Sequence, residues 1–88
     1  MSNPETLSAV ERAKKALSSM ADKKPLAGKP PRDLILAAMR VFRESKPSAQ
    51  ATASVNGQWS AALGFADKSQ WREALWAFER GASAIRGR

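Results

Sequence analysis

The clearest candidate for chemistry in this sequence is one aromatic residue flanked by two arginines. Trp76 has Arg72 four residues before it and Arg80 four residues after it, and residues four apart share one face of a helix. An exposed indole in this setting could stack on a nucleobase whose phosphates the arginines contact, or it could anchor a protein interface. Arginines that merely cover the indole through cation–π contacts, or burial of Trp76 under another helix, would explain the same spacing.

Further basic residues lie toward the two ends of the chain. Such residues can follow a phosphate backbone, with an affinity that falls as salt rises. Solvated chain ends give the same pattern and are the alternative interpretation. The candidate residues for binding nucleic acid or a partner are Arg72, Trp76, Arg80, Lys14, Lys15, Lys23, Lys24 and Arg86.

The charge balance narrows the class of partner. The 88 residues include 15 Lys and Arg against 8 Asp and Glu, a net charge of +7. An excess of this sign favours a polyanion such as nucleic acid, or an acidic protein. No apolar run is long enough to span a membrane, and the N-terminus does not resemble a secretory signal, so we expect a cytoplasmic protein.

The residues needed for catalysis are scarce. The chain has no Cys and no His, which removes the usual nucleophile, general base and zinc ligands. The carboxylates lie near expected helix ends or within four residues of a Lys or Arg, where dipoles and ion pairs explain them. We therefore expect no enzyme activity, no cofactor, no metal and no small-molecule substrate.

The elements that must position these side chains are helices, because Ala, Leu, Lys, Arg and Glu dominate. The first helix is expected from Pro4 to about Asp22, with a narrow, alanine-rich apolar stripe. Residues 23–31 then hold three prolines and a glycine, which end the helix. This pattern divides the chain into an N-terminal basic helix and linker at 1–31, acting as an arm, and a helical core domain at 32–88.

Residues 47–66 contain no charged side chain, so this segment is either packed deeply or presented to a partner. The Asn56-Gly57 pair predicts a break into two short helices. Ala53, Gly57 and Leu63 stand at offsets that resemble a helix-turn-helix motif, which would imply a DNA-reading helix from Gln58 onward. A plain turn between two helices is the alternative for the same pair.

The last helix carries the clearest periodicity. Asp67 with Gln70 resembles a capping box at its start. Trp71, Leu75 and Phe78 continue at four- and three-residue spacing into Ala82 and Ile85, which predicts a core face. Trp76 lies roughly 140° from Trp71 on this helix, away from that face.

The fold class predicted is all-α: a compact bundle of three to four helices with an N-terminal helical arm. The leading functional hypothesis is a non-enzymatic nucleic-acid-binding or nucleoprotein accessory factor. The alternative is a protein-interaction module, a small regulator or inhibitor that docks on an acidic partner or assembles with itself as a homo-oligomer. A third hypothesis, association of the first helix with a membrane surface, is weakened because that helix has no Trp or Phe.

Overall fold

The computed structural model describes residues 4–24 and 28–86. These ranges form four helices and contain no strand, and the helices are α1 (Pro4–Ala21), α2 (Pro31–Glu44), α3 (Ala49–Asp67) and α4 (Trp71–Arg86). The prediction of an all-α bundle of three to four helices is confirmed. None of the described helices is long and apolar enough to cross a bilayer.

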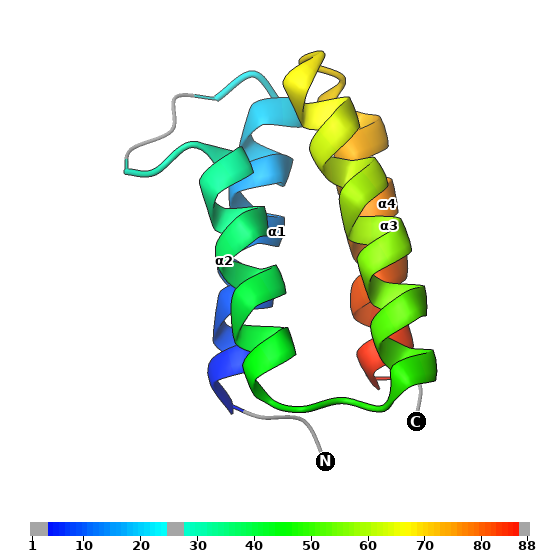
Figure 1. The fold of residues 1–88 in the computed structure, drawn as a ribbon. Helices are drawn as coiled ribbons and strands as arrows, with labels where there is room; N and C mark the ends of the chain where they lie inside the picture. Colours follow the sequence, from blue (N-terminus) through cyan, green and yellow to red (C-terminus); the bar gives the residue numbers. More distant parts are fainter. Residues whose placement is uncertain (1–3, 25–27, 87–88) are drawn as a thin grey trace.

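The helices alternate in direction and form a ring (Figure 1). α1 packs against α2 and α4, and α3 packs against the same two helices, with the most extensive contact between α3 and α4. The α1–α2 pair and the α3–α4 pair therefore form opposite sides of a body that measures 35 × 21 × 18 Å. Side chains on neighbouring helices of this ring can contact one ligand together, whereas those on helices across the ring are separated by the core.

The first helix is part of the core and does not stand apart as the expected arm. Val10, Ala13 and Leu17 of α1 are buried, together with Ala16. Each alanine in the apolar stripe of α1 buries little area by itself. In the bundle, the small side chains let α1 approach α2 and α4 closely, so that Val10 and Leu17 reach the shared core.

The uncharged segment forms one continuous helix, so the break predicted at Asn56-Gly57 is wrong. α3 runs through Gly57, and its N-cap is Ser48, whose hydroxyl accepts a hydrogen bond from the Ala51 amide at 3.1 Å. Without a turn at Gly57, the resemblance to a helix-turn-helix motif fails. One glycine in a helix costs about 1 kcal/mol, and the burial of Val55 and Trp59 on either side of it offsets that cost.

Trp59 is the centre of the core. Its side chain is fully buried, stacks on Phe78 with ring centroids 4.8 Å apart, and meets the edge of Phe42 at 5.9 Å. Its indole N–H donates a hydrogen bond to the Phe78 carbonyl oxygen at 3.0 Å. Gly81 makes room for this arrangement, because a Cβ there would lie 2.5 Å from two indole atoms.

Helices α1 and α3 are each followed by a residue with a left-handed backbone conformation. Lys23 and Ser69 have φ of 59° and occupy the position after the helix cap. The amides of Ser69 and Gln70 donate to the carbonyls of Ala66 and Phe65, which is the Schellman pattern, and α1 ends in the same way.

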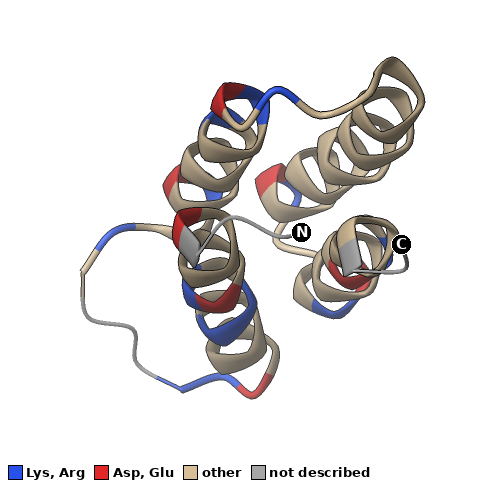
Figure 2. Ribbon diagram, turned by 90° about the horizontal axis from the view of Figure 1, so that it is seen from below, with Lys and Arg blue, Asp and Glu red and all other residues tan. Residues whose placement is uncertain are grey.

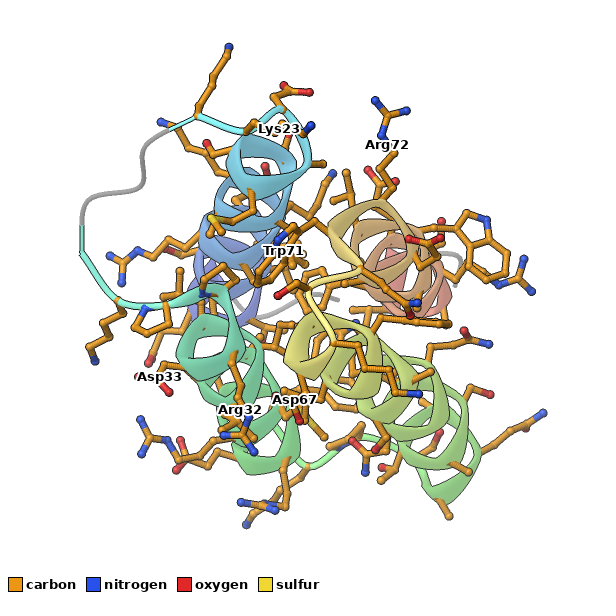
Figure 3. All side chains as sticks on the ribbon, turned by 90° about the horizontal axis from the view of Figure 1, so that it is seen from above. Lys23, Arg32, Asp33, Asp67, Trp71 and Arg72 are labelled. Atoms are coloured by element: carbon orange, nitrogen blue, oxygen red, sulfur yellow. The ribbon has the colours of Figure 1, made fainter. Side chains whose placement is uncertain are left out.

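Asp67 is the last residue of α3, so the predicted capping box at the start of α4 is wrong. Its carboxylate accepts a hydrogen bond from Arg32 Nε at 2.9 Å, which joins the end of α3 to the start of α2. Figure 3 shows these two side chains pointing toward one another. The backbone carbonyl of Gln70 accepts the Ala74 amide and begins α4 instead.

Candidate nucleic-acid interface

Trp76 projects from the outer face of α4. The core face of this helix is formed by Ala74, Ala77, Phe78 and neighbouring residues, and Trp71 and Leu75 are half-buried along its edge. Trp76 lies outside that face and is 58% exposed, the largest exposure among the large apolar residues that the structure describes. Its placement away from the core agrees with the helical periodicity.

Arg80 covers part of the indole. Its guanidinium carbon lies 4.9 Å from the centre of the Trp76 ring, which is within the range of a cation–π contact. At an exposed site such a contact contributes about 0.5–1 kcal/mol. That energy is small enough for an incoming ring to displace the guanidinium or to share the indole with it.

The exposed indole borders a hollow between α3 and α4, which we call the indole hollow. Its lining residues are Trp76, Glu79, Arg80 and Ser83 of α4 with Ser54 and Gln58 of α3. It is a shallow hollow, open to solvent, with a volume of about 570 Å³. The amide of Gln58 and the hydroxyls of Ser54 and Ser83 can donate and accept hydrogen bonds, as base edges require.

Three of the predicted binding residues lie at the end of the bundle where α1 ends and α4 begins. Lys23 and Lys24 follow α1, and Arg72 is in the first turn of α4. Figure 3 views the molecule from this end and shows Arg72 extending away from the bundle. Arg72 is thus one turn from Trp76 on the same helix and is placed to contact a phosphate next to a base on the indole.

Lys14 and Lys15 lie on a different side of the molecule. They line a hollow between α1 and α4 together with Leu75, Glu79, Glu11 and Arg12, which we call the middle hollow. Lys14 Nζ lies 4.0 Å from a carboxylate oxygen of Glu11. Glu79 lines both the middle hollow and the indole hollow, so this residue lies between the two.

Arg86 is the predicted binding residue that lies farthest from the others on α4. It is the last residue of that helix, about 20 Å from Arg72 at about 1.5 Å per residue. Its side chain lies outside the described part of the structure. The fold therefore does not bring Arg86 next to Arg72.

Sequence reasoning missed a cluster of cations between α1 and α2. Arg12 of α1, Lys29 of the connecting segment and Arg40 of α2 line a hollow with Glu5, Ser8 and Leu34, which we call the cationic hollow. The three cations come from separate segments, so only the fold brings them together. Arg12 also lines the middle hollow.

The charges are distributed unevenly around the bundle (Figure 2). α1 and α2 carry both signs along their length, whereas α3 has no charged residue before Asp67. The outward residues of α3 include Ala53, Gly57, Ser60 and Gly64, all exposed. The molecule thus presents a charged side and an uncharged side that borders Trp76.

The described residues contain no group of three or more metal-ligating side chains close enough to hold a metal ion. Comparisons with protein-family models, with curated proteins and with solved structures found no match to this chain.

Proposed function

We propose that this protein is a non-enzymatic nucleic-acid-binding accessory factor that contacts unpaired bases through Trp76. The observation that supports this function best is the half-covered indole beside a hollow whose lining includes three neutral hydrogen-bonding side chains together with Glu79 and Arg80. Arg80 lies on the indole and Arg72 lies one turn away, so cations for the flanking phosphates stand beside the stacking surface. The net charge of +7 adds attraction over a longer range.

The proposal is for a single strand because bases in a duplex are already stacked. A helix side that carries one aromatic residue cannot reach the flat face of a paired base, whereas an unpaired base can lie on an indole. Stacking of this kind contributes roughly 1–3 kcal/mol per base and tolerates any base. We therefore propose binding with little sequence preference, to single-stranded RNA and single-stranded DNA alike.

The test is a titration of fluorescently labelled single-stranded RNA, single-stranded DNA and duplex DNA at low and moderate salt. We expect the single strands to bind, more weakly as salt rises, and Trp76→Ala to weaken binding by roughly 5- to 150-fold. Absence of binding by the intact protein at low salt would overturn the proposal.

Two substitutions separate stacking from general apolar contact. Trp76→Phe keeps an aromatic face and should retain most of the affinity, whereas Trp76→Leu keeps apolar area and should lose it. Leu36→Ala, which alters an exposed apolar residue on α2, is the matched control and should bind as the wild type does. Equal affinities for the Phe and Leu variants would contradict base stacking.

The second candidate function is a protein-interaction module. The uncharged outer side of α3, formed by small residues beside Trp76, favours it because such a surface permits close approach of another helix. On this alternative, Trp76 is the interface anchor and the excess charge speeds encounter with an acidic partner. Weak salt dependence of partner binding, together with equal tolerance of Leu and Phe at position 76, would favour this alternative.

A further inference from the structure

We propose that a bound single strand follows a track from Trp76 around α4 and α1 and ends in the cationic hollow between α1 and α2. This inference rests on the proposed function and adds to it a second, distant phosphate contact. Arg12, Lys29 and Arg40 form that contact. They lie on the side of the bundle opposite the indole hollow, because α1–α2 and α3–α4 are opposite pairs in the ring.

Shared lining residues place the three hollows in sequence around the bundle. The indole hollow and the middle hollow share Glu79, and the middle hollow and the cationic hollow share Arg12. A strand that leaves the indole would cross the outer side of α4 at Glu79, pass Lys14 and Lys15, and cross α1 at Arg12. Figure 2, which looks along the helices, shows that α4 and α1 are neighbours along this route.

The charges along the track favour phosphate at its far end. The cationic hollow brings together Arg12, Lys29 and Arg40 against the carboxylate of Glu5. The middle hollow is more balanced, since Glu11 and Glu79 stand among its cations. A strand would thus be held at its two ends, by stacking on Trp76 and by ion pairs at the cationic hollow, and more loosely between them.

If the track holds one strand at both of its ends, the binding affinity should depend on the length of the strand. A short strand reaches one end of the track, whereas a longer strand gains the second contact at a high effective concentration. The extra affinity must exceed the simple statistical advantage of having more starting positions on a longer strand. Neutralising the three cations should remove this excess and leave the short strand unaffected.

The experiment compares labelled oligothymidylates of about 4 and about 16 nucleotides, lengths that bracket single-strand sites in other proteins. For the wild type, we expect the affinity for the longer strand to exceed the affinity for the shorter one by about tenfold or more, after correction for the larger number of positions at which a longer strand can bind. In the variant Arg12→Gln/Lys29→Gln/Arg40→Gln, we expect that excess to disappear. The plot of log affinity against log salt for the longer strand should become less steep, its slope smaller in magnitude by about 2. Each phosphate contact on a single strand contributes about 0.7 to that magnitude, and the variant removes three cations.

A matched control removes three exposed cations elsewhere. Arg43→Gln/Lys46→Gln/Lys68→Gln has the same net charge as the test variant, and its residues lie outside the three hollows. It should keep the excess affinity for the longer strand. Equal losses in the two triple variants would mean that the effect is one of net charge, and would overturn the track.

A gain of affinity provides a further check that unfolding cannot imitate. Glu79→Gln removes a negative charge at the junction of the indole and middle hollows, so the longer strand should bind several-fold more tightly. Unchanged or weaker binding would overturn a path across Glu79, as would a stoichiometry of two long strands per protein. If the wild type binds neither strand, the proposed function fails; if it binds both without excess affinity for the longer one, only the track fails.

Discussion

The two halves of the bundle are built on different principles. The α3–α4 half is held by large aromatic residues, with Trp59 stacked on Phe78 and hydrogen-bonded to the α4 backbone. In the α1–α2 half, Phe42 is the one aromatic residue of the two helices, and Leu17 and Ile35 fill the core beside it. Both halves also bury alanines: Ala13, Ala16 and Ala38 in α1–α2, and Ala62, Ala66, Ala74, Ala77 and Ala82 in α3–α4. The α3–α4 half presents the uncharged outer side of α3, whereas α1 and α2 carry more of the charged residues. The two halves thus differ in the aromatic content of their cores and in surface charge.

The largest expected effect concerns the aromatic half. Trp59→Ala should lower the free energy of unfolding by about 3–5 kcal/mol, because it removes a fully buried ring and leaves a cavity between α2, α3 and α4. Urea denaturation followed by circular dichroism measures the change. Trp71→Ala, at a half-buried position, is the control and should cost less. Equal costs at the two positions would contradict the central role given to Trp59.

The α1–α2 half should respond to added volume. Ala13→Leu should lower the free energy of unfolding by about 1–3 kcal/mol, because Ala13 is fully buried and three more carbons would have to fit into the packed core. Ser18→Leu places the same side chain on the exposed side of α1 and should be nearly neutral. Thermal unfolding of the two variants checks this, and a stabilised Ala13→Leu would show that α1 packs loosely.

The smallest effects concern the helix ends, where the two halves should behave alike. Ser69→Gly in the α3–α4 turn and Lys23→Gly after α1 each relieve a left-handed backbone conformation. We expect each to raise the free energy of unfolding by about 0.5 kcal/mol, after the added entropy of glycine in the unfolded chain is subtracted. Gly28→Ala tests the opposite change. Gly28 has φ of 98°, a conformation that alanine adopts only with strain, so this substitution should destabilise the protein. A destabilised Ser69→Gly variant would contradict this account.

Helices in which charged and large apolar residues alternate could be predicted from the sequence better than helices of small uncharged residues. α4 alternates large apolar residues with charges, so its apolar side and the outward position of Trp76 could both be read from spacing. Within that side, Phe78 and Ala82 are buried as predicted, whereas Trp71, Leu75 and Ile85 are half-buried at its edge. The buried Ala74 and Ala77 were not predicted, because alanine gives little periodic signal. α3 is a mixture of Ala, Ser and Gly without charge, so periodicity offered little help, and the intrinsic preference of Asn56-Gly57 suggested a break. Packing over the whole length of α3 overrides that preference.

The candidate site was predictable only where it lies on one helix. Arg72, Trp76 and Arg80 are near each other because of the helical repeat. Ser54 and Gln58 complete the indole hollow from another helix, and no pattern in the chain marks them. Arg12, Lys29 and Arg40 are scattered in the sequence and meet only when α1 and α2 pack together. Asp67 has the right type and spacing for a cap, but its partner Arg32 is distant in the chain.

The contact between Trp59 and Gly81 also constrains how this sequence can change over generations. A methyl group at position 81 would overlap the indole of residue 59, so neither position can be exchanged freely while the other is fixed. In related chains, a residue larger than glycine at 81 should occur only where residue 59 is smaller than tryptophan. The two positions should therefore covary as a pair, and that covariation would identify distant members of the same fold even where every surface charge has been replaced.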